Sequence, residues 1–232
     1  MKKIVLMIAA AALMTSCLGI MNFKIVRGDG IPGSKTFDEL KFDGIGIRGS
    51  MDIIYHQVPG SGSAVLYTDQ NLLNDYEIVP INGVLEVSTF DGVSPIPKTK
   101  TYVEAASPNL RSVKISGSGS CEIADNLTTS DDFYFVLSGS GSLKADTIVC
   151  DNFSAKISGS GNIKVHSLTA DDISIEITGS GNTEIICRDA GDIDVRISGS
   201  GNVHLSGNAR SLNTKITGSG NINTRNLALS GK

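Results

Sequence analysis

The chain has 232 residues, of which 19% are charged and 5% aromatic, and its formal net charge is −4. A mildly acidic chain with no later cluster of Lys and Arg is a poor candidate for nucleic-acid binding, because neutralising phosphates takes clustered positive charge. The 26 glycines do not follow a period of three, which excludes a collagen-like chain.

The N-terminus carries the features of an export signal. A short positive start precedes the apolar run Ile4–Leu13, which is shorter than the roughly 20 residues that cross a bilayer and is typical of a secretory signal peptide. Two small residues stand directly before Cys17, an arrangement that resembles a lipobox, although Met14 occupies the usual Leu position. We therefore predict a lipoprotein signal peptide over residues 1–16 and lipidation at Cys17, so that acyl chains anchor the chain to a membrane.

The next segments change from irregular to strand-like. Residues 17–36 mix Gly, Pro and polar residues without a sustained period, which predicts a flexible tether after the lipidated cysteine. Between residues 37 and 108, short alternating runs predict strands of a less regular β part. Within it, Asn82-Gly83 predicts a two-residue hairpin turn, and NLLNDY at Asn71–Tyr76 predicts one helical turn.

A repeat dominates residues 109–232. The phrase Ser/Thr-Gly-Ser-Gly-Ser/Asn occurs six times at intervals of 19 to 22 residues, starting at Ser116, Ser138, Ser158, Thr178, Ser198 and Thr217. Apolar and polar residues alternate on both sides of each phrase, which predicts strands with one inward face. A period near 20 predicts a β-solenoid, in which each repeat is one coil and the stacked coils share a core. We predict an all-β fold with one solenoid domain over residues 37–232 and a strand-rich N-terminal cap.

Four stretches resemble a known family: FDGIGIRGSMDIIYHQ, NLLNDYEIVPINGVLEVST, VEAASPNLRSVKISGSGS and the GSGN series. In combination they are similar to the DUF2807 family, also described as putative auto-transporter adhesin, head GIN domain, over about residues 37–226. The resemblance implies a right-handed parallel β-helix and an outer-membrane lipoprotein of a Bacteroidetes-type cell envelope. It brings no established activity and no functional residues. Surface lipoproteins of such bacteria tend to carry acids after the lipidated cysteine, so LGIMN after Cys17 favours the periplasmic face.

The repeated glycine phrase has two interpretations. It is neither a P-loop nor a dinucleotide-binding loop, because the required Lys and glycine spacing are missing. In a solenoid it would supply one tight turn per coil, and asparagines of successive coils would stack and bond to one another. The same turns would also place polar side chains on one surface, where a glycan or protein ligand could bind. This candidate contact surface comprises Ser118, Ser140, Ser160, Asn162, Ser180, Asn182, Ser200, Asn202, Ser219 and Asn221.

Acidic residues recur at the corners between coils, where Asp commonly starts or caps a turn. A calcium ladder is the alternative, since Ca²⁺ takes several oxygen ligands, and its candidates are Asp131, Asp151, Asp171 and Asp192. We expect no catalytic residues and no cofactor, because the histidines are scattered and no triad or zinc-protease spacing occurs. The cysteines after Cys17 lack the spacing of a zinc site or disulfide framework.

These observations predict a lipid-anchored cell-envelope protein, a non-catalytic binding or adhesion-type solenoid whose ligand the sequence leaves open. Two alternatives remain. One is a polysaccharide-active β-helix enzyme with paired carboxylates in a groove, and the other is a purely structural envelope factor. An uncovered coil edge can pair with another chain, which allows a homo-oligomer.

Overall fold

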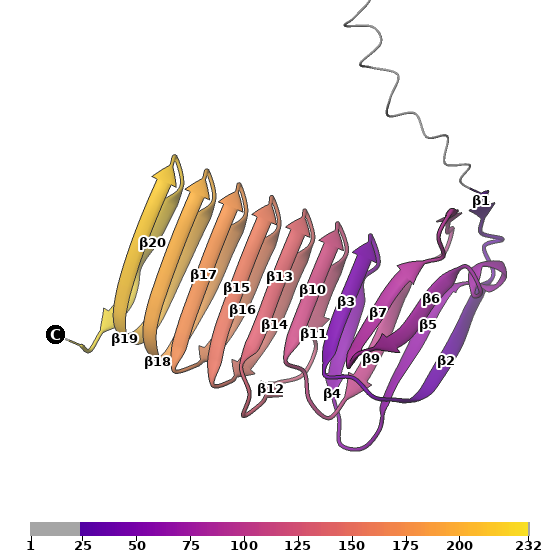
Figure 1. Ribbon diagram of the computed structural model, residues 1–232, viewed down its shortest axis with the longest axis horizontal. Helices are drawn as coiled ribbons and strands as arrows, with labels where there is room; N and C mark the ends of the chain where they lie inside the picture. Colours follow the sequence, from indigo (N-terminus) through magenta and orange to yellow (C-terminus); the bar gives the residue numbers. More distant parts are fainter. Residues whose placement is uncertain (1–23, 232) are drawn as a thin grey trace, which may run out of the picture.

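The computed structural model describes residues 24–231, so the predicted signal peptide and Cys17 lie outside the described residues. Nearly all secondary structure in this part is β-strand, and a 3-10 turn, η1 (Gln70–Leu72), lies where we predicted one helical turn. Within the same part, no helix is long and apolar enough to cross a membrane. Figure 1 shows a row of stacked coils along the long axis, with a less regular group of strands at the N-terminal end.

The regular stack consists of strands that pair in parallel with strands one coil away. The strands that lead into the glycine turns are β10 (Ser112–Gly117), β13 (Phe133–Gly139), β15 (Asn152–Gly159) and β17 (Asp172–Gly179). Those that leave them are β11 (Ser120–Ile123), β14 (Ser142–Val149) and β16 (Asn162–Thr169), with a short β12 (Leu127–Thr128) after β11. The last coils are formed by β18 (Asn182–Gly199), β19 (Asn202–Gly218) and β20 (Asn221–Leu229).

The register keeps the repeat phrases aligned from coil to coil. Ser158 faces Ser138 on one side and Thr178 on the other, and the same alignment holds from β10 through β19. Neighbouring strands of a sheet lie about 4.8 Å apart, so each coil adds that rise to the stack. The predicted parallel β-solenoid with coils of about 20 residues is confirmed.

The core is a set of apolar columns that run along the stack. The residue before the glycine phrase is buried in five coils, at Ile115, Leu137, Ile157, Ile177 and Ile197. Burying such a side chain fully stabilises the fold by about 1.5–3 kcal/mol, so these columns are a principal source of stability. In the outermost coil, by contrast, Ile216 is 44% exposed, because no further coil within residues 24–231 covers it.

The N-terminal cap contains one more coil of the same stack. β3 (Gly44–Gly49) and β4 (Ile53–Gln57) pair in parallel with β10 and β11. On their other side they pair with β7 (Val84–Thr89) and β9 (Tyr102–Ser107). The regular stack therefore begins at residue 44, earlier than the predicted boundary at 109.

The sequence hides this coil for two reasons. Met51 stands in the position that Gly119 occupies in the next coil, since Gly49 faces Gly117 and Ile53 faces Cys121. In addition, the chain leaves the coil after β4, forms the strands on its N-terminal side, and returns to the opposite side with β10. Its neighbours in the stack are therefore not its neighbours in the sequence.

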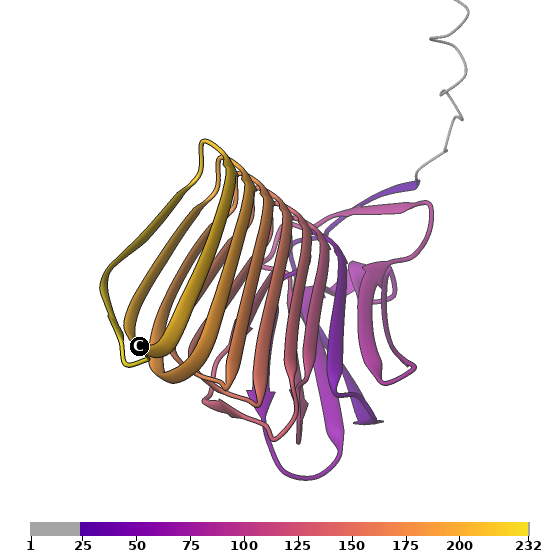
Figure 2. The same ribbon diagram turned by 60° about the vertical axis from the view of Figure 1, so that its left-hand side comes forward.

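Antiparallel strands close the N-terminal end. β2 (Pro32–Leu40) pairs with β5 (Gly62–Asp69), β5 also pairs with β9, and β6 (Tyr76–Ile81) pairs with β7. The β6–β7 connection is the predicted hairpin turn, and φ is positive at both Asn82 (52°) and Gly83 (82°). In Figure 2 the coils lie one behind another, with this cap at the far end.

The described part of the predicted flexible tether is not a tether. β1 (Lys24–Arg27) pairs in parallel with β8 (Val93–Ile96), and residues 32–36 are the first half of β2. Phe37 and Leu40 of β2 pack against the core. The strand partners are far away in the sequence, so the local Gly and Pro content could not reveal them.

Candidate functional site

The turn glycines are required by the stacking of the coils. Gly159 has a φ of 133°, in a region that is essentially restricted to glycine. A Cβ at this position would lie 2.2 Å from the carbonyl oxygen of Gly139 in the previous coil, and the N–H of Ser160 donates a 2.9 Å hydrogen bond to that oxygen. The same arrangement recurs from Gly117 to Gly218. Because these N–H groups bond to the previous coil, they do not form an open nest for an anion.

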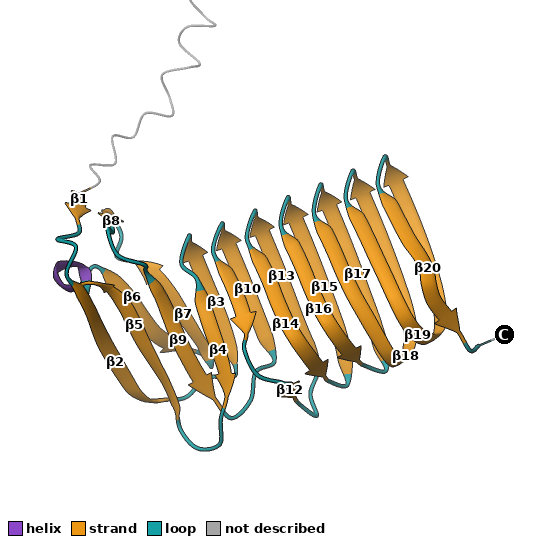
Figure 3. Cartoon of the chain, turned by 180° about the vertical axis from the view of Figure 1, so that it is seen from behind, coloured by secondary structure: helices purple, strands orange, loops and turns teal. Residues whose placement is uncertain are grey.

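The predicted contact surface lies along one edge of the stack. Figure 3 shows its turns in a row at the tips of the strand arrows. All ten side chains are exposed: Ser118, Ser140, Ser160, Asn162, Ser180, Asn182, Ser200, Asn202, Ser219 and Asn221. The structure thus brings the predicted residues onto one surface, and their role in binding stays a prediction.

The asparagines of this surface form a hydrogen-bonded ladder. Asn182 donates from Nδ2 to Oδ1 of Asn162 over 3.1 Å, and Asn202 donates to Oδ1 of Asn182 over 2.9 Å. Asn221 lies in register with Asn202 on the next strand. A side-chain amide has two N–H donors and two acceptor lone pairs. Each bonded amide therefore keeps donor and acceptor capacity for another molecule.

The ladder borders a surface hollow that we call the asparagine face. Besides Asn162, Asn182, Asn202 and Asn221, it is lined by the next outward side chains, Lys164, Glu184, His204 and Asn223. The Lys164 ammonium lies 3.3 Å from the Glu184 carboxylate, an exposed pair that contributes about 0–1 kcal/mol. The face combines amides with one balanced charge pair, which suits a polar ligand of low net charge.

The acidic corner column differs from the prediction at one position. The N–H of Asp151 donates to the carbonyl of Asp131 over 3.1 Å, and that of Asp171 donates to Asp151 over 2.8 Å. The N–H of the predicted fourth member, Asp192, donates to the carbonyl of Asp171 over 3.0 Å, but by strand register Asp192 faces Asp172. Gly191 occupies the column position, where a Cβ would lie 1.8 Å from the carbonyl oxygen of Asp171. The close approach of the two coils therefore requires glycine at position 191. The carboxylate of Asp192 lies one residue beyond the column position.

The carboxylate of Asp192, one of the calcium candidates, is bound by neighbouring side chains. Side-chain hydrogen bonds from Arg210 and Ser211 lower the pKa of Asp192 to about 2, and both Nε and Nη2 of Arg210 reach its carboxylate, over 2.9 and 2.8 Å. Within residues 24–231, no group of three or more His, Cys, Asp or Glu side chains is arranged to hold a metal ion. The backbone hydrogen bonds of the column agree with the turn-forming interpretation, and calcium binding stays a prediction.

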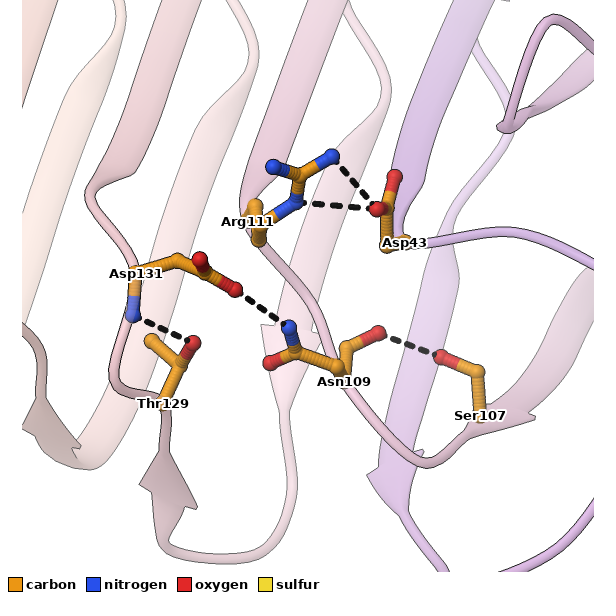
Figure 4. A network of polar contacts seen from close by, with 6 residues as sticks. All are labelled: Asp43, Ser107, Asn109, Arg111, Thr129 and Asp131. Atoms are coloured by element: carbon orange, nitrogen blue, oxygen red, sulfur yellow. Dashed lines mark hydrogen bonds and ion pairs between the residues drawn. The ribbon is translucent and has the colours of Figure 1, made fainter.

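A second group of charged side chains lies where the chain passes from the cap into the stack (Figure 4). Arg111 binds Asp43 through Nη2 at 2.6 Å and Nε at 2.9 Å. Asn109 donates to Asp131 over 2.9 Å, and its own carbonyl accepts a 2.8 Å hydrogen bond from Ser107. These contacts fix the crossing segment between β9 and β10.

This junction does not resemble the paired carboxylates of a glycosidase. Such enzymes need one carboxylic acid with a raised pKa opposite a second carboxylate. Here Asp43 is held in an ion pair, and hydrogen bonds from Tyr134 and Asn152 lower the pKa of neighbouring Asp132. Sequence reasoning missed this group because Asp43 and Arg111 are far apart in the chain.

The described cysteines are buried free thiols. Burial raises the pKa of Cys121 and Cys150 to about 12 and that of Cys187 to about 11. Thiolates are the reactive form of cysteine, so these side chains are unreactive at neutral pH. They act as small apolar groups of the core columns.

A family model described as putative auto-transporter adhesin, head GIN domain (DUF2807) matches residues 41–184 and 160–231. The two matches overlap over residues 160–184, because similar coils allow the family model to align with the repeat in more than one position. Together they cover more than half of the chain. No curated protein matches the chain.

Several solved structures share the fold. A putative adhesin from Bacteroides fragilis is 19% identical, with a TM-score of 0.72 over 86% of this chain and 99% of that one. A putative adhesin from Parabacteroides merdae is 22% identical, with a TM-score of 0.70 over 86% and 98%. A putative lipid binding protein from Parabacteroides distasonis is 23% identical, with a TM-score of 0.65 over 87% and 99%. At these identities the likeness shows the fold alone.

Proposed function

Given that the chain belongs to the family of putative auto-transporter adhesins with a head GIN domain, we propose that it is a lipid-anchored cell-envelope protein that binds a ligand and catalyses no reaction. The observation that carries this proposal is the asparagine face. Its amides are exposed, aligned and only partly bonded to one another, whereas Asp43, Asp131 and Asp192 are held by neighbouring side chains.

The asparagine face fits a ligand rich in hydroxyl groups. Amide oxygens accept from hydroxyls and amide N–H groups donate to them, and the ladder offers such a group at every coil, about 4.8 Å apart. A chain-like glycan would meet several amides at once, so individually weak contacts would add along the stack. The structural relatives described as adhesins and as a lipid binding protein agree with a binding role.

The proposed anchor is Cys17. A lipidated cysteine would hold the solenoid at the outer membrane, and the neutral residues after it favour the periplasmic side. Mass spectrometry of the N-terminal peptide tests the acylation. Protease treatment of intact cells tests the side, because a periplasmic protein is cleaved only after the outer membrane is opened.

A binding screen of the mature protein against glycans and matrix proteins tests the ligand. We expect the Asn182→Ala/Asn202→Ala variant to lose at least the larger part of the affinity, because it removes two adjacent amides of the ladder. Ser174→Ala is the matched control, since Ser174 is exposed on β17 and does not line the asparagine face. Equal binding by both variants would rule out this face. Failure to bind any ligand would favour the purely structural alternative, and cleavage of a polysaccharide would favour the enzymatic one.

A further inference from the structure

A small two-stranded arm projects from the cap, formed by β1 and β8 together with residues 28–31 and 97–98. Figure 3 shows β1 and β8 next to each other at the outer corner of the cap. In their register Ile25 faces Ser94 and Arg27 faces Ile96, so Ile25, Arg27 and Ile96 share one face of the arm. The opposite face carries Val26, which packs against the core.

The shared face exposes large apolar side chains. Ile25 is 61% exposed and Ile96 is 41% exposed, and Ile31 in the link to β2 is 60% exposed. An isolated exposed Ile is ordinary, but several in one short element indicate an interaction surface. The opposite face borders a pocket on the cap that Val93 and Pro95 help to line, whereas Ile25 and Ile96 on the shared face are exposed within the described residues.

The base of the arm is fixed by a buried carboxylate. Asp69 accepts hydrogen bonds from the N–H groups of Gly30 (2.6 Å), Lys98 (2.8 Å) and Thr99 (3.1 Å). Burial alone would raise the pKa of Asp69, but the hydrogen bonds from Thr99, Lys98 and Gly30 outweigh it and lower the pKa. The two strands of the arm are therefore joined to the cap by one ionised group, which holds the apolar face in a defined orientation.

The arm also differs in charge from the rest of the chain. Three basic residues, Lys24, Arg27 and Lys98, lie in the arm (residues 24–31 and 93–98), against the one acid Asp29, whereas the whole chain has a net charge of −4. Basic residues beside exposed apolar ones are the composition of elements that lie in the headgroup region of a membrane, and each basic side chain near an anionic surface contributes about 1 kcal/mol.

The position of the arm in the chain points to the same partner. Cys17 lies seven residues before Lys24, and seven residues span at most about 25 Å. We propose that the arm docks on the bilayer, with Ile25 and Ile96 in the headgroup region and Arg27 and Lys98 on anionic lipids. This inference rests on the proposed lipid anchor at Cys17. Docking would orient the solenoid so that its coils stack away from the arm.

A single introduced tryptophan tests the docking, because the chain contains no Trp. The full chain carrying Ile96→Trp is purified from membranes and reconstituted into phosphatidylethanolamine/phosphatidylglycerol vesicles with brominated acyl chains. Val136→Trp is the matched control, because Val136 is 38% exposed on β13 of the stack, close to the 41% of Ile96. We expect a blue shift and bromine quenching for Ile96→Trp, and neither for Val136→Trp. Adding Arg27→Glu and Lys98→Glu should reduce the quenching.

The outcomes separate the docking from the anchor. Acylated protein in which Ile96→Trp and Val136→Trp respond alike overturns the docking and leaves the anchor intact. A blue shift of Ile96→Trp without quenching means that the arm is buried against another protein chain, which also overturns it. An N-terminal peptide without acyl chains refutes the anchor, and the docking falls with it.

Discussion

Replacing Gly159 by Ala should destabilise the solenoid without changing any exposed polar group. The residue has a φ of 133°, and holding a residue with a Cβ in such a region costs about 1–3 kcal/mol. The new Cβ would lie 2.2 Å from the Gly139 carbonyl oxygen, so the coils must move apart there. That movement weakens the 2.9 Å hydrogen bond from Ser160 to the same oxygen, whose net contribution is about 0.5–1.5 kcal/mol. The expected loss is therefore about 2–4 kcal/mol.

Urea unfolding of the mature protein, followed by circular dichroism, measures this loss as a lower midpoint. Ser160→Ala is the control in the same turn. Its side chain is exposed, so we expect a change within about 0.5 kcal/mol. If Gly159→Ala unfolds at the same urea concentration as Ser160→Ala, the glycine is not required for stacking. The phrase would then have to be reconsidered as a binding loop.

Three further predictions concern the core, the arm and the thiols. Ile175→Asp buries an unpaired carboxylate and should lower the free energy of unfolding by several kcal/mol. Its control, Glu176→Gln on the outward side, should lower that free energy by at most about 1 kcal/mol. Equal melting temperatures for the two variants would show that the inward column is misassigned. Because the pKa of Asp69 is lowered, its carboxylate stabilises the arm fully above a pH of about 4, and this stabilisation is lost as the pH falls through the lowered pKa. Asp69→Asn should therefore speed amide hydrogen exchange in β1 at pH 7 and remove the acid dependence of that exchange. Unchanged exchange in this variant would contradict the role of Asp69. Cys121, Cys150 and Cys187 should resist a thiol reagent at pH 8 in the folded protein and react in denaturant; rapid labelling of folded protein would contradict their burial.

The repeat allowed the fold to be predicted from the sequence, because each coil places apolar residues in the core and glycines in the turn at the same positions. Ile157 and Gly159 recur in aligned positions, so one-dimensional spacing was enough to assign inward columns and turns. Where the structure uses a contact that does not recur, the sequence carried no signal. The coil at residues 44–57, the pairing of β1 with β8 and the ion pair between Arg111 and Asp43 all join segments distant in the chain. The displacement at Asp192 likewise depends on the local corner.

The position of β3 and β4 between β7 and β10 constrains the order in which the protein can assemble. This coil is made early in synthesis, but its strands pair with segments that are made later. These are β7 and β9 on one side and β10 and β11 on the other. Closing those long loops carries an entropic cost, so this coil acquires both neighbours only after β10 and β11 have been made. Beyond it, each coil has only to add to its predecessor, as in other one-dimensional repeat arrays. Gain or loss of a whole coil at the C-terminal end therefore changes the length of the molecule in steps of about 4.8 Å and leaves the pairings of β3 and β4 unchanged.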